Sequence, residues 1–157
     1  MSAEHRYELR VEWTGDEGAG TASYAGYRRD HTISAPGKPD LLGSSEPGFR
    51  GDASRYNPEE LLVASLSGCH LLWYLHACSA ARVVVIGYED EPVGTMVEEA
   101  GGTGRFTDVL LRPRVVVAEP GMVERAGTLH DAAHRNCFIA RSVNFPVRHE
   151  PEVSADS

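Results

Sequence analysis

Residues 57–80 read NPEELLVASLSGCHLLWYLHACSA, and they include the most apolar stretch of the chain. Asn57 can cap a helix and Pro58 suits the first helical position, while the two glutamates that follow favour the positive end of the helix dipole. We expect a helix that runs to about residue 80. Its apolar residues lie nearly all round, so we expect burial on most sides.

This helix is better explained as a core helix than as a membrane span, which needs about 20 apolar residues. Its apolar run is interrupted by four polar residues: Ser65, Ser67, His70 and His76. The N-terminus, MSAEHRYELRVEW, lacks the basic-then-apolar layout of a signal peptide. We therefore predict a cytoplasmic protein.

The N-terminal part of the chain predicts strands followed by a long loop. Apolar and charged residues alternate over residues 5–14, which is typical of a half-buried antiparallel strand. Residues 20–34 predict either one further strand or two. Residues 35–56 are rich in Gly, Pro, Ser and Asp and predict a long loop, a kind of segment that usually has a functional role. The first and last few residues are expected to be loose ends.

The C-terminal part predicts a hairpin, a second helix and a last strand. Residues 83–99 and 105–119 each predict a strand, with a flexible hairpin tip between them. A helix is expected over residues 121–136. Residues 143–150 predict a final strand, which Pro146 would restrict to a sheet edge. Strands and helices are segregated along the sequence, so we predict a single α+β domain over residues 1–157.

The charge of the chain disfavours nucleic acid and acidic membranes as partners. The net charge is −8 over 157 residues, whereas phosphate binding needs a cationic face. Apolar residues make up 41% of the chain, which is enough for one sizeable core.

Three cysteines, Cys69, Cys78 and Cys137, are the candidates for redox chemistry. In a cytosolic chain, so few cysteines suggest a transient catalytic disulfide rather than a structural framework. On one helix Cys69 and Cys78 would point in opposite directions, about 13 Å apart along the axis. A disulfide needs Cα atoms within about 7 Å. If Cys69 has a partner in its own chain, that partner is Cys137, and Cys78 is expected in the core.

A reactive thiol also needs a positive group, because the thiolate is the nucleophile. Cys69 lies in the middle of its helix and gains little from the helix end. An arginine from elsewhere is the best candidate, since its guanidinium stays charged. The loop offers Arg50 and Arg55, and the preceding strand offers Arg28 and Arg29.

A metal site is the main alternative that the residues themselves raise. His130, His134 and Cys137 share one helical face, and HDAAH is a loose version of HExxH. Aspartate replaces the glutamate, however, and no fourth ligand follows from the sequence. We expect His130 and His134 to be surface histidines, and His70 to be a packing or polar contact residue.

The runs NPEELLVASLSGCHLLWYLHAC and HRNCFIARSVNFPVRHEP resemble the signature of the OsmC/organic hydroperoxide resistance family. The resemblance extends over roughly residues 20–150. YRRDH and FRGDASRYNPEELL are similar to a less studied OsmC-like branch. The resemblance implies an intertwined homodimer, in which strongly bent antiparallel sheets wrap long buried helices. It also implies reduction of organic hydroperoxides, and hydrogen peroxide less well, without metal, haem or flavin.

Carried onto this sequence, the resemblance makes Cys69 the peroxide-reducing cysteine and Cys137 its disulfide partner. A dithiol, in the family often a lipoyl protein, would restore both thiols. Glu59 matches the glutamate that the family places near the reactive sulfur. Because Glu59 lies about 15 Å from Cys69 along the helix, we expect it to serve the partner chain by holding an arginine. For that arginine we favour Arg50 slightly over Arg29, because a loop residue can fold over a site.

Two other interpretations remain open at this stage. One is a metal-binding or redox-sensing OsmC-like protein without efficient peroxidase turnover. The other is a relative that has lost peroxidase activity and acts as a binding module, which the presence of both cysteines disfavours.

Overall fold

The structure is a computed structural model that describes residues 2–156. The chain forms two compact units, Met1–Leu61 and Leu62–Ser157. That residues 1–157 act as a single domain stays a prediction.

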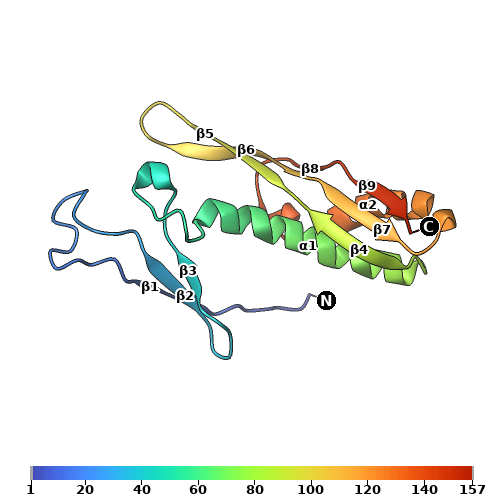
Figure 1. Cartoon of the computed structure of the whole chain (residues 1–157), viewed down its shortest axis with the longest axis horizontal. Coiled ribbons are helices and arrows are strands. Elements are labelled where there is room, and N and C mark those ends of the chain that lie inside the picture. Colours follow the sequence, from blue (N-terminus) through green and yellow to red (C-terminus); the bar gives the residue numbers. More distant parts are fainter. Residues whose placement is uncertain (1, 157) are drawn as a thin grey trace. The chain divides into compact units, whose positions relative to one another are not determined.

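The first unit is built on a small antiparallel sheet of order β1-β2-β3 (Figure 1). Its strands are β1 (Arg10–Trp13), β2 (His31–Ser34) and β3 (Leu41–Gly43). The predicted first strand is therefore confirmed over four residues. The predicted loop 35–56 is shorter than expected, because it contains β3 and the 3-10 helix η1 (Pro47–Phe49).

The expectation of a half-buried first strand is wrong within this chain. Tyr7, Leu9 and Val11 are 86%, 66% and 66% exposed, although they alternate with charged residues as the prediction required. Alternation can mark an apolar face, but it does not say what covers that face. Residues 14–30 form turns without a strand, so the second strand starts only at His31.

The long helix α1 (Pro58–Ala80) has the predicted bounds. Its N-terminus is a capping box: the Asn57 side chain accepts a hydrogen bond from the Glu60 N–H (2.8 Å), and Glu60 accepts one from the Asn57 N–H (3.0 Å). Its C-terminus is a Schellman motif, in which the Val83 N–H reaches the Cys78 carbonyl (2.9 Å). Arg82 occupies the left-handed position of that motif with φ of 60°.

The second unit adds a shorter helix, α2 (Val123–Asn136), flanked by the 3-10 helices η2 (Pro120–Met122) and η3 (Ala140–Ser142). Two three-stranded sheets complete it, with orders β4-β7-β9 and β5-β6-β8. Their strands are β4 (Val85–Asp90), β5 (Val93–Glu98), β6 (Gly104–Leu111), β7 (Pro113–Val117), β8 (Val147–His149) and β9 (Glu152–Ala155).

The predicted hairpin is confirmed, but each of its two predicted strands is divided in two. β5 pairs with β6, and β4 pairs with β7, both antiparallel. Pro92 separates β4 from β5, because proline has no N–H for the ladder. On the opposite strand the Arg112 N–H donates to the Asp90 carboxylate (2.7 Å) rather than to a strand. Both arms of the long hairpin thus pass from one sheet to the other at the same point, from β4 to β5 at Pro92 and from β6 to β7 at Arg112.

The two sheets of the second unit are mixed, so the expectation of antiparallel sheets is wrong for this unit. β8 pairs with β6 in parallel, and β9 pairs with β7 in parallel. Parallel pairing needs a crossover connection, and α2 supplies it between β7 and the last two strands. Residues 152–155, expected to be loose, form strand β9. β8 lies at a sheet edge, as Pro146 predicted.

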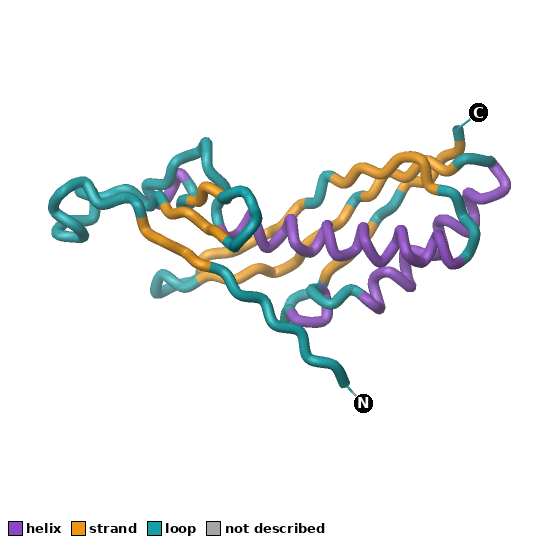
Figure 2. The backbone as a smooth tube through the Cα atoms, turned by 90° about the horizontal axis from the view of Figure 1, so that it is seen from below, coloured by secondary structure: helices purple, strands orange, loops and turns teal. Residues whose placement is uncertain are grey.

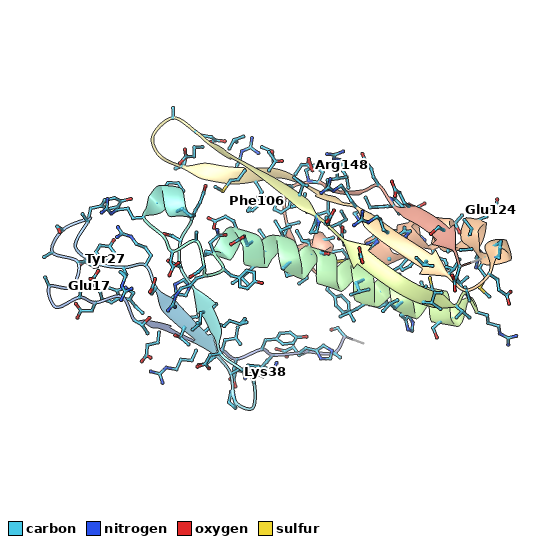
Figure 3. The ribbon with its side chains drawn as sticks, in the orientation of Figure 1. Glu17, Tyr27, Lys38, Phe106, Glu124 and Arg148 are labelled. Carbon is cyan, nitrogen blue, oxygen red and sulfur yellow. The ribbon has the colours of Figure 1, made fainter. Side chains whose placement is uncertain are left out.

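In the second unit both helices lie on the same side of the strands (Figure 2). α1 buries one stripe at spacing i, i+4: Leu66, His70, Tyr74 and Cys78. This stripe contributes to two core clusters, one around Tyr74, Val115 and Val117 and the other around Leu66, Val109 and Leu111. Phe106 on β6, labelled in Figure 3, packs against the second cluster.

Burial of α1 on most sides is not seen within one chain. Leu72 is 68% exposed and Leu75 is 38% exposed, on the side away from the buried stripe. The sheets cover one face only, so the remaining apolar face stays open. Among the described residues, α1 is the one helix long and apolar enough to cross a membrane by length and composition. In this chain it packs on the sheets along one stripe only, so the prediction of a core helix is confirmed for that face alone.

Candidate functional site

Cys69 and Cys137 lie together, although 68 positions separate them in the sequence. Cys69 is in the middle of α1 and partly exposed, while Cys137 is buried at the C-cap of α2. Their side chains are close enough to raise the pKa of the Cys137 thiol, and the Ala140 N–H donates to the Cys137 sulfur (3.4 Å). α2 ends at Cys137, where the backbone turns to an extended conformation. The two thiols are therefore neighbours across the two helices.

Burial is the main cause that raises the pKa of the Cys137 thiol to about 11, and the hydrogen bond with Cys69 raises it further. The Ala140 N–H acts in the opposite direction but does not compensate. Cys137 is thus a neutral S–H at physiological pH and a hydrogen-bond donor to the Cys69 sulfur. A thiol of this kind is a poor first nucleophile, because reactivity follows the thiolate.

Cys78 lies in the core, as predicted. It is 1% exposed, and burial raises the pKa of its thiol. Its side chain shares a hydrogen bond with Tyr74. Among the three thiols, only Cys69 is partly open to solvent, so it alone can meet a dissolved reactant in this chain.

Arg29 is held within the first unit by two tyrosines. Its guanidinium donates to the carbonyls of Tyr24 (2.8 Å) and Tyr27 (2.6 Å) and stacks on both rings. Tyr27 in turn packs edge-on against Trp13. The N–H donors and the flat face of the Arg29 guanidinium are thus occupied by contacts within the first unit. Of the two predicted arginines, Arg29 is therefore the less available for a contact with Cys69.

Arg50 lies at the end of η1 with a left-handed backbone, φ 64°. Its guanidinium carbon is 5.9 Å from the Tyr24 ring centroid, and within residues 2–156 it forms no ion pair. The loop arginine therefore keeps its charge available. Arg55 differs, because it is paired with the buried carboxylate of Asp30 (3.6 Å).

Glu59 lies in the first turn of α1 and is half-buried. α1 is continuous from Pro58 to Ala80, so ten helical residues separate Glu59 from Cys69, as the sequence required. The capping contacts at this helix end are made by Asn57 and Glu60. Glu59 is therefore not needed as the cap.

The histidines form a cluster that the sequence did not predict. His130 is buried rather than on the surface, and its Nδ1 lies 3.0 Å from Nε2 of the equally buried His70. The Tyr74 ring stacks on His130, with 3.9 Å between centroids. His149 of β8 faces both rings and is bonded to Asp131 (3.1 Å). The prediction that His70 is a packing and polar contact residue is confirmed.

The cluster is not arranged as a metal site. Within residues 2–156, no three His, Cys, Asp or Glu side chains converge closely enough to hold an ion. His130 instead bonds to His70, while Cys137 faces Cys69. His130 and Cys137 on this helical face thus pack α2 against α1, whereas His134 faces His149 of β8.

An apolar hollow next to Cys69 was missed by the sequence interpretation. Leu72, Trp73 and His76 line a shallow cavity of about 240 Å³. These residues follow Cys69 by three, four and seven positions, so they share its side of α1. Phe138, directly after Cys137, packs edge-on against Trp73 (5.3 Å between centroids). Helical spacing from Cys69 was the signal that could have found them.

The mixed sheets, the two facing helices and the paired thiols define a class of α+β proteins with a dithiol pair between helices. Within that class, the chain belongs to the OsmC-like protein family, whose family model matches residues 51–152. No protein of curated function matches the chain in sequence.

The solved structures agree with this family. An OsmC-like protein of unknown function from Vibrio cholerae is 32% identical, with a TM-score of 0.83 over 95% of this chain and all of that one. An organic hydroperoxide resistance protein from Elizabethkingia anophelis is 16% identical, with a TM-score of 0.67 over 98% and 100%. One from Bacillus subtilis is 20% identical, with a TM-score of 0.59 over 93% and 98%. The last two share the fold with this chain.

Proposed function

We propose that this protein is a cysteine-based peroxidase that reduces organic hydroperoxides, and hydrogen peroxide less well. The observation that carries the proposal is the contact between a partly exposed Cys69 and a buried, neutral Cys137. Membership of the OsmC-like family and the names of two structural relatives support a peroxide-related redox role.

The first step uses the Cys69 thiolate. Its sulfur attacks one peroxide oxygen, the O–O bond breaks, and the leaving alkoxide takes a proton to become an alcohol. Cys69 becomes a sulfenic acid. The neutral Cys137 can donate its hydrogen bond to the Cys69 sulfur during this step, and its raised pKa keeps it from competing for the peroxide.

The second step closes the disulfide. The Cys137 sulfur attacks the Cys69 sulfur, the S–S bond forms, and water leaves with the Cys137 proton. A dithiol reductant, for which we propose a lipoyl protein, then reduces the disulfide and restores both thiols. No metal, haem or flavin enters this cycle. We place the protein in the cytoplasm, where thiols are kept reduced.

An organic substrate suits the hollow beside Cys69. Leu72 and Trp73 are apolar and line a cavity with His76. Helical spacing puts all three residues on the same side of α1 as Cys69. Burial of an alkyl or aryl group there would gain about 25 cal/mol for each Å² of apolar surface removed from water. Hydrogen peroxide has no such group, so we expect it to be the weaker substrate.

We propose Arg50 as the cation that activates Cys69, with Arg29 second. Arg29 already donates to two tyrosine carbonyls, whereas Arg50 forms no ion pair within residues 2–156. For Glu59 we propose a role in the partner chain, where it would hold the activating arginine. The ten-residue separation on α1 argues against a role at Cys69 of the same chain.

We also propose that the active form is a homodimer in which the two chains intertwine. Large apolar side chains stay open in a single chain, both on the N-terminal segment (Tyr7, Leu9, Val11) and on α1 (Leu75). Monomeric proteins rarely leave so much apolar surface exposed. Sedimentation of the purified protein tests this, and a monomer at micromolar concentration would overturn the shared-site proposal.

The peroxidase proposal is tested by treating the reduced protein with one equivalent of cumene hydroperoxide and mapping the thiols by mass spectrometry. We expect a Cys69–Cys137 disulfide with Cys78 free. Cys69→Ser should abolish turnover, and Cys137→Ser should react once and stop at sulfenic or over-oxidised Cys69. Cys78→Ser is the control and should keep turnover. Full turnover by Cys69→Ser would refute the proposal.

The role of Glu59 is tested with mixed subunits. Glu59→Ala and Cys69→Ser chains are each expected to be inactive or weak alone. Mixing them should restore part of the activity only if Glu59 of one chain serves Cys69 of the other. No restoration in a verified mixed dimer would contradict the shared site.

A further inference from the structure

Within the described residues, three polar contacts join α1 and α2, in antiparallel order. The Tyr74 hydroxyl donates to the Ala126 carbonyl (2.9 Å), and His70 bonds to His130 (3.0 Å). The Cys69–Cys137 thiol contact is the third. As the number rises along α1, the partner on α2 falls. The histidine contact therefore lies next to the thiol contact, between it and the tyrosine contact.

The histidine contact is tied to each sulfur through the backbone. His70 directly follows Cys69 in α1. On the other side, His130 and Cys137 are seven residues apart, which is two helical turns and nearly the same direction. The helix is rigid between His130 and Cys137. The position of the His130 ring therefore determines the position of the Cys137 sulfur.

The two rings are held as neutral groups. Burial, and then the neighbouring His149 and His134, lower the pKa of His70 to about 4. Burial, and then His70 and His149, lower the pKa of His130 to about 3, against the raising effect of Asp131. A neutral pair forms one N–H···N bond, whichever ring donates. Within the described residues, His130 Nε2 has no partner, so the bond to His70 is the one hydrogen bond of this ring, beside the stacking of Tyr74.

We infer that the His70–His130 hydrogen bond positions Cys137 against Cys69 and thereby sets how readily the disulfide closes. This inference rests on the proposed function, since it assigns positioning residues to the second step of that cycle. Neither histidine touches the reacting sulfur atoms in this role. The effect is one of proximity: a looser α2 end lowers the effective concentration of one thiol beside the other.

The test measures disulfide equilibrium without any peroxide. The reduced protein is equilibrated with oxidised and reduced glutathione at pH 7, where the protein dithiol and one glutathione disulfide exchange for the protein disulfide and two glutathione thiols. Acid quenching, alkylation and mass spectrometry give the fraction with Cys69 joined to Cys137. The equilibrium constant reports how readily the disulfide closes, even if no peroxide is reduced.

Two substitutions at one position separate the hydrogen bond from the packing. His70→Gln places an amide nitrogen near the site of Nε2, so it keeps the bond to His130. His70→Asn carries the same amide one carbon shorter and cannot reach. We expect His70→Asn to lower the equilibrium constant by about tenfold, which raises the reduction potential by about 30 mV. His70→Gln should stay within about twofold of the unchanged protein.

Substitution on the other helix gives an independent measurement. His130→Leu keeps most of the volume and removes the bond, and it should match His70→Asn. Tyr74→Phe is the matched control, because it removes the hydrogen bond to Ala126 and leaves the ring stacked on His130. It should lower stability and leave the glutathione equilibrium unchanged.

Several results would overturn the inference. One is an equilibrium constant for His70→Asn within twofold of that for His70→Gln. Another is a decrease of the equilibrium constant in Tyr74→Phe as large as the decrease in His130→Leu, since this would mean that the packing of the two helices is loosened in general. A wild-type protein that forms no Cys69–Cys137 disulfide with glutathione would also overturn it. Failure of the peroxidase proposal would be seen in the other experiment, in which the thiols would stay intact after treatment with cumene hydroperoxide.

Discussion

The raised pKa of Cys137 makes the stability of the protein depend on pH in an alkaline window. A buried thiol with pKa near 11 holds its proton in the folded state, whereas in the unfolded chain it titrates near its ordinary value of 9.0. Above pH 9 the folded state therefore binds more protons than the unfolded state. The free energy of unfolding must fall as pH rises through this window, and no effect is expected below it.

The size of this effect follows from the two pKa values. At pH 8 almost no proton is lost from either state, so the contribution to the free energy of unfolding is under about 0.1 kcal/mol. At pH 10 the unfolded thiol is mostly ionised and the folded one is not, and the loss reaches about 1.3 kcal/mol. Cys137 is 1% exposed, so solvent screening is small.

Urea unfolding at pH 8 and pH 10, under reducing conditions, measures this loss. Cys137→Ser is the comparison, because serine fits the site and does not ionise in this range. We expect the wild-type protein to lose about 1.3 kcal/mol more than the variant between the two pH values. Cys78 and Cys69 are present in both proteins. Equal losses in the two proteins would refute the assignment of a buried neutral thiol at residue 137.

Three further substitutions test the local structure of α1. Arg82→Gly removes a side chain from the left-handed position that ends the helix, so we expect a gain of about 0.5–1 kcal/mol by thermal unfolding, and a loss would contradict the Schellman end. Asn57→Ala removes half of the capping box and should cost about 1 kcal/mol, measured by urea unfolding, whereas an unchanged midpoint would argue against the cap. Leu66→Ala opens a cavity at a residue that is 1% exposed and should cost about 2–5 kcal/mol. A cost below 1 kcal/mol would mean that this part of the core is loosely packed.

The sequence by itself determined the elements with strong local signals. Asn57, Pro58 and Glu60 marked the start of α1, and the structure begins the helix there with a capping box. Helix geometry alone excluded a Cys69–Cys78 pair within one chain, whereas a disulfide between Cys69 and Cys137 stays a prediction. These inferences hold because they depend on neighbours within a few turns, where spacing fixes direction.

The tertiary structure decided what depends on distant partners. The change of sheet at Pro92 and Arg112, and the parallel pairing of β8 and β9, follow from how the hairpin and α2 pack rather than from any local pattern. The same holds for His70 and His130, which are 60 residues apart and meet only because α2 folds back along α1. Periodicity can say that a face is buried, but the residue that it meets is fixed by long-range packing.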